Sequence, residues 1–393
     1  MNSILRFFEK YTLLLLVGLI ILSPAVVYAR GIPDNPSLEK RALAPEPDLF
    51  NRSLDLSDTL PVAPEQIESR VKDKFPLRNK IIQLTNFARY KFLRVNPTHN
   101  VREGQDGFFF YTDDANQRLT RGDLFDDEEL ARWTSELQKR HEYARTRGIA
   151  YYVFVSPIKD TLYPEKLPAD YPELADYRRS EQLVAALREN TDVEVVYLRD
   201  PLEEALRQNP DQRLYQKTDS HWNSHGSFLA YTEIMETLEK DFPKLTPYAR
   251  TDFEITVNPD IVGDFAYHMG IGDFLSEPDY PVYTFTPYQN PYAESAVEFR
   301  QVSIPELTEP VPYQLAKANT ITPGPRVLML HSSYMDLMRQ FFNLHFEETT
   351  YYKLPINFDT EIVAAQDPEI IIQEFSEQSL FDAPYSNLPA DID

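Results

Sequence analysis

The strongest constraint on the fold is a short run of apolar and aromatic residues, Ile149 to Val155, that directly follows Gly148. The run is too short for a helix and rich in aromatic and β-branched residues, which is typical of a strand buried on both faces of a sheet. Upstream, Asp126 and Glu129 have the spacing of a capping box, so the sequence predicts a helix that begins there and stops at Gly148. A helix followed by a doubly buried strand indicates an α/β protein.

The same alternation continues toward the C-terminus. The sequence predicts helices at 179–189, 227–240 and 335–345, and strands at 107–111, 193–198, 327–330 and 370–375. A mainly parallel sheet covered by helices is the expected architecture. The span 250–322 breaks the alternation with many prolines and tyrosines, and we expect an irregular insertion there, of the kind that is often functional.

The first thirty residues predict export. Arg6 and Lys10 precede the uncharged stretch 11–29, which is long enough to span a bilayer. Val27-Tyr28-Ala29 resembles a signal-peptidase site, so residues 1–30 are either a signal peptide or an uncleaved signal-anchor. We favour an anchor in the inner (cytoplasmic) membrane, with the rest of the chain periplasmic or otherwise extracytoplasmic.

The exported part divides by composition. Prolines among charged residues predict an extended tether at 31–64. Apolar residues at helical spacing predict an amphipathic helical lead-in at 65–100, interrupted by Pro76. The α/β domain is expected at 101–393.

Charge and cysteine content exclude several function classes. The net charge of −23 repels phosphate backbones and anionic lipid surfaces, so nucleic acid is not an expected partner. The absence of cysteine removes disulfides, thiolate metal sites and cysteine nucleophiles.

The run Thr218-Asp219-Ser220-His221-Trp222 carries two parts of an activated-serine site. Residues two apart in an extended or turn segment point to the same side, so Asp219 can fix one imidazole nitrogen of His221 and leave the other free as a base. The alternatives are an aspartate that caps the next turn and a histidine that packs beside Trp222. His225, four residues after His221, raises a metal alternative, but the residues between them complete no zinc site and we expect no metal.

Ser332-Ser333-Tyr334 follows the predicted strand 327–330 and precedes a predicted helix. Ligands of open parallel sheets bind beyond the carboxyl ends of the strands, and the amides of a helix N-terminus can stabilise an oxyanion. A serine here is therefore either a nucleophile or an ordinary helix cap.

From Asn51 onward the chain resembles the alginate O-acetyltransferase AlgJ/AlgX-like group of SGNH-hydrolase-like proteins, also called the DHHW type. The matching stretches occur in order: Asn51 to Leu54, Phe75 to Arg78, Gly107 to Tyr111, Gly148-Ile149, Pro157 to Glu165, Thr218 to Asn223, His225-Gly226, and Ser332 to Tyr334. The resemblance implies a flavodoxin-like, three-layer αβα fold in circularly permuted order, with the Asp and His before the Ser. It also implies Asp219, His221 and Ser333 as the catalytic triad, and it alone selects Ser333 over Ser332.

The resemblance further implies the activity. Such a protein transfers acetyl groups through a serine acyl-enzyme to sugar hydroxyls of an exopolysaccharide or cell-wall polymer, without a cofactor. A membrane-bound O-acyltransferase would supply the acetyl groups. The residues expected to line the site are Lys159, Trp222, His331, Ser332 and Tyr334.

This chain departs from the family pattern at two places. His331 and Ser332 stand where the family usually has glycine and then aspartate or threonine, and Glu377-Gln378 replaces a Glu-Arg pair. Because a bulky His331 could narrow the turn at the nucleophile, two alternatives stay open, an exported carbohydrate acetyl-esterase and a non-catalytic scaffold of a polysaccharide assembly complex.

Overall fold

The computed structural model describes residues 78–277, 279–285, 297–303, 312–318, 324–343, 345–389 and 392. The expected membrane segment, the expected tether and the first part of the expected lead-in lie outside this range. The chain divides into two compact units, 1–98 with 266–275, and 99–265 with 276–393. Within the described ranges, no helix is both long and apolar enough to cross a bilayer.

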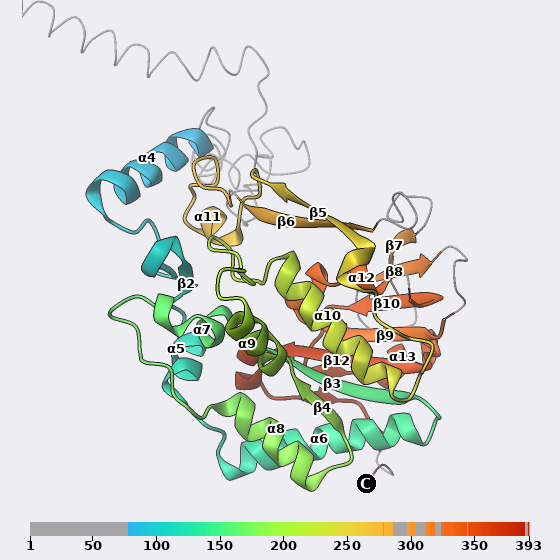
Figure 1. Cartoon of the computed structure of the whole chain (residues 1–393). Helices are drawn as coiled ribbons and strands as arrows, with labels where there is room; N and C mark the ends of the chain where they lie inside the picture. The colour runs from blue at the N-terminus through green and yellow to red at the C-terminus, as the bar shows by residue number, and fades with distance from the viewer. Residues whose placement is uncertain are drawn as a thin grey trace, which may run out of the picture. The chain divides into compact units, whose positions relative to one another are not determined.

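The larger unit is built on a seven-stranded sheet with the order β4-β3-β12-β9-β10-β8-β7 (Figure 1). The strands span β3 Ala150–Ser156, β4 Glu194–Tyr197, β7 Val297–Ser303, β8 Pro312–Ala318, β9 Arg326–His331, β10 Glu348–Tyr352 and β12 Ile370–Ser376. The five strands from β4 to β10 pair in parallel, whereas β8 and β7 are antiparallel. Counted from β9, the parallel strands have the order 2-1-3-4-5 of flavodoxin-like sheets.

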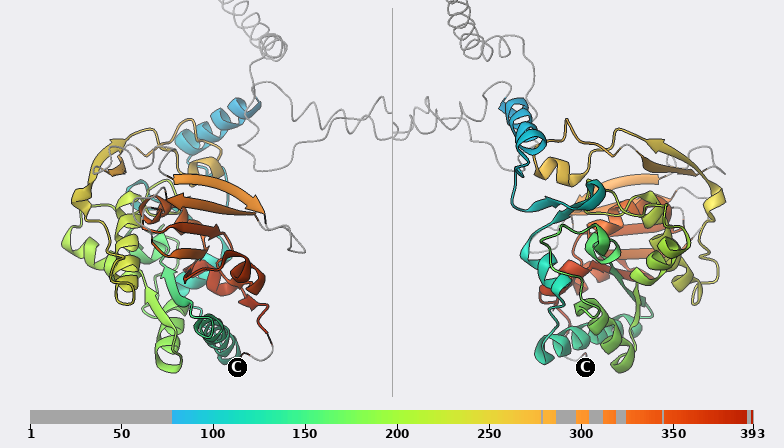
Figure 2. Two further views of the ribbon diagram at one scale, coloured as in Figure 1. Left: turned by 90° about the vertical axis from the view of Figure 1, so that its right-hand side faces the viewer. Right: turned by 60° about the vertical axis from the view of Figure 1, so that its left-hand side comes forward.

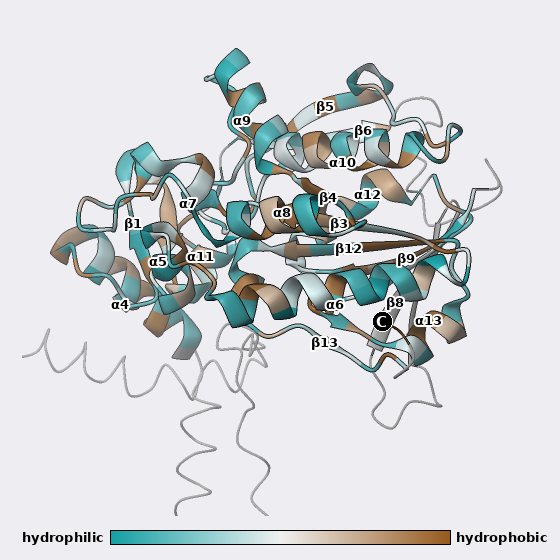
Figure 3. Ribbon diagram, turned by 90° about the horizontal axis from the view of Figure 1, so that it is seen from below, coloured by the Kyte–Doolittle hydropathy of each residue, from teal (hydrophilic) through white to brown (hydrophobic). Residues whose placement is uncertain are grey.

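Helices cover both faces of this sheet. They span α5 Asp114–Arg121, α6 Asp127–Arg145, α7 Lys159–Leu162, α8 Arg179–Asn190, α9 Arg199–Gln208, α10 Ser224–Glu239, α12 Arg339–Phe342 and α13 Thr360–Gln366. Along β3, Tyr152 and Phe154 join the core with α9 and α10, while Val153 and Val155 join the core with α6, α8 and α13. In Figure 3 the apolar strands lie between helices with hydrophilic stretches.

The predicted helix before Gly148 and the predicted strand after it are confirmed as α6 and β3. Asp126 accepts from the Glu129 amide at 2.8 Å, and the Glu129 carboxylate accepts from the Asp126 amide at 3.4 Å, which forms the capping box of α6. Gly148 follows α6 with a positive φ of 71°, a conformation that glycine adopts without strain. The strands predicted at 193–198, 327–330 and 370–375 correspond to β4, β9 and β12.

The helix predicted at 335–345 is confirmed only in part. The chain forms a 3-10 turn, Ser333–Leu337, followed by the single α-helical turn of α12. Met335, Met338 and Phe341 are fully buried at a spacing of three residues. This spacing suits a helix with three residues per turn better than one with 3.6.

The strand predicted at 107–111 is shorter than expected. Gly107 closes a 3-10 turn, and β2, Phe109–Tyr111, pairs antiparallel with β1, Val101–Glu103.

The span 250–322, expected to be irregular, contains regular strands in its described parts. β5, Phe253–Asn258, pairs with β6, Tyr280–Phe285, and β7 and β8 extend the main sheet at one edge (orange in Figure 2). Pro312 is the first residue of β8, and Pro281 is the second residue of β6. Proline is tolerated at strand starts and in edge strands, so it does not exclude a strand there.

Three further short elements occur in the described part of the chain. They are α11 Asp264–His268, β11 Asn357–Phe358 and β13 Tyr385–Ser386.

The smaller unit pairs α4, Arg78–Leu93, with the segment 266–275. The Asn86 side chain donates to the Met269 carbonyl at 3.0 Å, and the Phe87 ring stacks on Phe274 with 4.6 Å between centroids. Hydrogen bonds and one aromatic pair thus join segments far apart in the sequence.

Candidate active site

The larger unit brings the three residues expected to form the triad into one hydrogen-bonded series. His221 Nε2 lies 2.8 Å from Ser333 Oγ, and His221 Nδ1 lies 2.7 Å from Asp219 Oδ1. Ser333 follows the carboxyl end of β9, while Asp219 and His221 lie in the loop before α10. With Nδ1–H donating to Asp219, Nε2 carries the lone pair that can accept the serine proton.

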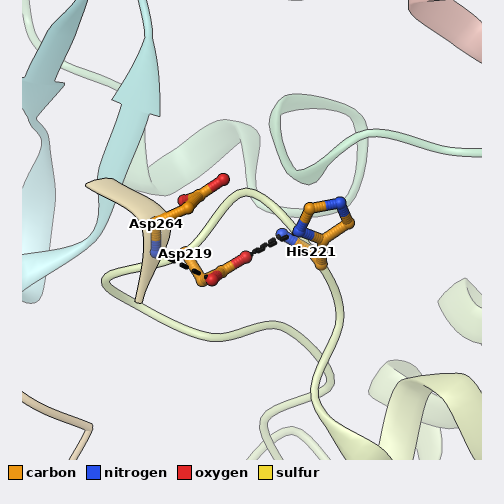
Figure 4. A group of neighbouring side chains, drawn as sticks. All are labelled: Asp219, His221 and Asp264. Atoms are coloured by element: carbon orange, nitrogen blue, oxygen red, sulfur yellow. Dashed lines mark hydrogen bonds and ion pairs between the residues drawn. The ribbon is translucent and has the colours of Figure 1, made fainter. Parts of the chain in front are cut away.

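Backbone amides hold the Asp219 carboxylate in place. Its Oδ1 also accepts from the His221 amide at 3.0 Å, and its Oδ2 accepts from the Asp264 amide at 2.8 Å (Figure 4). Burial raises the pKa of Asp219, but these bonds and the imidazole lower it below its usual value. Burial lowers the pKa of His221, but the hydrogen bond and charge of Asp219 and the charge of Asp264 raise it above its usual value.

Asp264 is a site residue that sequence reasoning missed. Its Oδ1 accepts from the Ser220 amide at 2.9 Å and its Oδ2 from the Ser220 hydroxyl at 2.6 Å. Burial and the charge of Asp219 raise the pKa of Asp264. Asp264 is the first residue of α11 and lies 45 residues from Asp219, so no local spacing could indicate it.

The predicted metal alternative takes a different form in the structure. Ligand atoms of Asp219, His221 and Asp264 lie within 4.8 Å of one another. Both carboxylates, however, already accept from protein N–H and O–H groups, and His221 Nε2 is directed at Ser333. His225 lies outside this cluster, because its Nδ1 bonds the Tyr283 hydroxyl at 2.7 Å.

Lys159 supports the loop that carries Asp219. Its ammonium donates to the carbonyls of Gln216 at 3.0 Å, Lys217 at 3.2 Å and Asp219 at 2.7 Å. It also lies 4.6 Å from the centroid of the Phe265 ring, an arrangement that favours a cation. Burial lowers the pKa of Lys159 to about 8, so the ammonium stays largely protonated at neutral pH. The sequence predicted a residue that lines the site, and the structure places it beneath the catalytic loop.

Trp222 and Tyr334 tie the two catalytic segments together. The Trp222 indole donates to the Tyr334 carbonyl at 3.2 Å, and the two rings meet edge to face at 4.9 Å. The Tyr334 hydroxyl donates to the Ser220 carbonyl at 3.2 Å, and its ring lies 5.0 Å from that of His221. Trp222 is fully buried and Tyr334 nearly so, so both pack the site from within.

Ser332 caps the turn and bonds away from His221. Its hydroxyl donates to the Glu374 carboxylate at 2.9 Å and accepts from the Tyr334 amide at 3.2 Å. Its own amide donates to Glu374 Oε2 at 2.9 Å. Burial raises the pKa of Glu374 to about 6. The cap alternative thus describes Ser332, and of these two serines it is Ser333 that is directed at the imidazole.

His331 does not narrow the turn, because its ring lies in the core beside β10. Nδ1 lies 2.6 Å from the Ser332 carbonyl, and Nε2 lies 3.1 Å from Nη2 of Arg339. Burial lowers the pKa of His331 to about 4, so the ring is neutral at pH 7. A carbonyl can only accept, so the proton resides on Nδ1 and Nε2 accepts from the guanidinium.

Glu377 is a buried anchor for the end of β3. It accepts from the Ile158 amide at 2.7 Å, the Thr161 hydroxyl at 2.6 Å, the Ser180 hydroxyl at 2.9 Å and the Tyr197 hydroxyl. These bonds fix the turn that leads into Lys159. Gln378, where the family has arginine, donates instead to the Asn116 side chain.

Several solved structures are similar to this one, all at low sequence identity. PatB1 of Bacillus cereus is 15% identical, with a TM-score of 0.51, over 71% of this chain and 96% of that chain. A DHHW family protein from Eubacterium siraeum is 14% identical (TM-score 0.46, 66% of this chain and 88% of that chain). The O-acetyltransferase domain of Pseudomonas putida AlgJ is 16% identical (TM-score 0.43, 75% and 96%). A search of curated proteins finds no match.

The sequence also matches a protein family directly. Residues 101–302, just over half of the chain, match the family described as SGNH hydrolase-like domain, acetyltransferase AlgX. This match confirms the resemblance stated from the sequence and the α/β fold with a mainly parallel sheet. The chain therefore belongs to the AlgX family of SGNH hydrolase-like acetyltransferases.

Proposed function

We propose that the protein is an extracytoplasmic polysaccharide O-acetyltransferase that works through an acetyl-serine intermediate on Ser333. The observation that carries the proposal is the series from Asp219 through His221 to Ser333, with separations of 2.7 and 2.8 Å. A serine hydroxyl this close to an oriented, unprotonated imidazole nitrogen is an activated nucleophile. Family membership supports acetyl as the group transferred.

The first half-reaction makes the acetyl-enzyme. His221 Nε2 takes the Ser333 proton as Oγ bonds to the carbonyl carbon of the donor, and the carbonyl oxygen becomes an oxyanion. Ser333 is the first residue of the 3-10 turn, so its amide has no acceptor within the turn and is available to this oxyanion. When the intermediate collapses, the bond to the leaving group breaks and His221 returns the proton to that group.

The second half-reaction moves the acetyl group to a sugar. His221 removes the proton of a sugar hydroxyl as its oxygen attacks the acetyl carbon, and collapse of the second intermediate breaks the bond to Ser333 Oγ, which regains a proton. Water attacking in place of the sugar would make the protein an acetyl-esterase. In this proposal a membrane-bound O-acyltransferase supplies the donor, and residues 11–29 anchor the chain in the inner membrane.

The test compares acetyl transfer with hydrolysis. The full-length chain receives an acetyl donor with and without an oligosaccharide, and acetylated sugar and free acetate are both measured. We expect acetylated sugar to form and to be lost in Ser333→Ala, whereas Ser135→Ala, on the exposed side of α6, behaves as wild type. Acetate release without acetylated sugar would identify an esterase, and activity retained in Ser333→Ala would rule out the acetyl-serine.

A further inference from the structure

Helix α4 leaves three large apolar side chains exposed and buries two polar ones. Ile81, Leu84 and Phe92 are 50%, 59% and 76% exposed, whereas Gln83 is 2% exposed and Asn79 is 8% exposed. A surface helix ordinarily has the opposite arrangement, because burial of its apolar stripe is what stabilises it. Among the residues that the structure describes, the apolar stripe formed by Ile81, Leu84 and Phe92 is therefore left exposed.

Hydrogen bonds fix this orientation. The Gln83 side-chain carbonyl accepts from the Asp273 amide at 3.0 Å, and the Asn86 amide group donates to the Met269 carbonyl at 3.0 Å. Rotating α4 to bury Leu84 would break both bonds and leave the Asp273 amide and the Met269 carbonyl without these partners. The outward apolar stripe therefore follows from specific contacts.

Cationic side chains border the apolar stripe. Residues 79–95 contain Lys80, Arg89, Lys91 and Arg94 and no acidic residue, although the whole chain carries a net charge of −23. On a helical wheel with 100° per residue, Ile81, Leu84 and Phe92 fall within an arc of about 80°. Measured from Ile81, Arg89 lies roughly 80° to one side and Lys91 roughly 80° to the other.

We propose that this face of α4 lies in the headgroup region of an anionic lipid bilayer. Apolar side chains on one arc with cations on both flanks are the arrangement of interfacial helices, whose cations extend to lipid phosphates while the apolar groups enter the acyl boundary. The net negative charge of the chain repels an anionic membrane as a whole, so a local cationic helix determines which part approaches it. This inference goes beyond acetyl transfer and does not depend on Ser333.

The position of α4 in the sequence supports a membrane as the occupant. Residues 30–77 separate the apolar stretch 11–29 from the start of α4. A chain of that length spans at most about 170 Å, so an anchor at 11–29 would keep α4 near the bilayer. Tethering also makes the contact intramolecular, so a weak lipid affinity suffices.

The chain contains no cysteine, so a single introduced thiol reports on α4 alone. In full-length Thr85→Cys, an environment-sensitive fluorophore is attached at an exposed position beside the apolar stripe. The labelled chain is reconstituted into nanodiscs of phosphatidylcholine alone or with added phosphatidylglycerol, and quenching by aqueous iodide is measured at low and high salt.

With phosphatidylglycerol, we expect blue-shifted emission and protection from iodide, and both should decline at high salt. Lys91→Gln should lower the ratio of protected to accessible label about fivefold, the factor for one cation at an anionic surface. Lys244→Gln, a matched loss of an exposed lysine in the larger unit, should leave the ratio unchanged, and Phe92→Ser should remove the blue shift.

Equal iodide access with and without phosphatidylglycerol would overturn the proposal. Protection that occurs in native membranes but not in protein-free nanodiscs would also overturn it, in favour of a protein partner. Ser333→Ala should leave the protection of the label from iodide unchanged. The lipid measurement can therefore fail while acetyl transfer is retained, and the reverse, so the two proposals are tested independently.

Discussion

Replacing His331 by phenylalanine tests how the turn at the nucleophile is held. Phenylalanine keeps the ring that packs on Tyr351 at 5.7 Å, but it cannot donate to the Ser332 carbonyl, which lies 2.6 Å from Nδ1. That carbonyl and the Ser333 amide belong to one trans peptide, so they point in opposite directions and turn together. A bond that fixes the carbonyl therefore aims the amide at the oxyanion.

The expected loss follows from what the amide does. Removing an oxyanion donor costs about 10²- to 10³-fold in kcat. His331→Phe leaves the Ser333 amide present but free to tilt, so we expect kcat to fall about 10- to 100-fold with little change in KM. The unpaired Ser332 carbonyl should also lower the free energy of unfolding by about 1–3 kcal/mol.

The assay separates catalysis from stability. Acylation is followed as the burst of 4-nitrophenol from 4-nitrophenyl acetate, and unfolding is followed in urea. His345→Phe is the matched control, because His345 is also a buried histidine with a hydrogen bond, between its Nε2 and the Tyr231 hydroxyl at 2.5 Å. It should lose stability and keep kcat. If His331→Phe acylates as fast as His345→Phe, the reasoning about the peptide is refuted.

Further predictions concern the groups around the triad. Lys159→Met leaves three carbonyls without a charged donor. We expect kcat to fall about 100-fold because Asp219 shifts, and we expect the urea midpoint of unfolding to drop. An unchanged kcat would contradict this prediction. Asp264→Asn removes a charge that raises the pKa of His221, so the acid limb of kcat/KM, where His221 becomes protonated, should move to lower pH; an upward shift would exclude this coupling. Glu374 has a pKa of about 6 in the fold against 4.5 ordinarily, so its contribution to the free energy of unfolding falls by about 2 kcal/mol as pH rises through these values. Glu374→Gln should lose that contribution, so chemical denaturation at pH 4.5 and 7 should show a smaller fall in the variant than in the wild type, and an equal fall would contradict the assignment.

Local patterns predicted the parts of the fold that local physics determines. The capping box at Asp126 and the apolar run before Ser156 identified α6 and β3, because capping and burial on both faces leave a signature in neighbouring residues. The two-residue spacing of Asp219 and His221 likewise indicated their hydrogen bond. Ser333 needed the family resemblance, since a serine after a strand is equally a cap.

Other features depend on contacts that no local pattern encodes. Asp264 reaches the site through a bond across 45 residues, from within a span whose prolines suggested irregular structure. The sequence also could not predict which face of the sheet the His331 ring occupies. β9 is buried on both faces, so its residues show no alternation of polar and apolar side chains from which the face could be read. The 3-10 turn Ser333–Leu337 could not be told from the start of an α-helix, since both place apolar residues three apart.

Fixed charges of opposite net sign lie on the two sides of the series Asp219–His221–Ser333. Beside Nδ1 of His221 lie two carboxylates, of Asp219 and Asp264, and the ammonium of Lys159, which together carry one negative charge when all are ionised. Behind the Ser332 carbonyl, Arg339 reaches His331 and pairs with Asp336 at 2.6 Å, and Asp336 pairs with Lys353 at 2.7 Å. That second trio carries one positive charge. In the proposed reaction, attack by Ser333 would create an imidazolium facing the first group and an oxyanion at the Ser333 amide, which is linked through His331 to the second group. These fixed charges would then favour the charge-separated intermediate over the neutral ground state without any rearrangement when it forms.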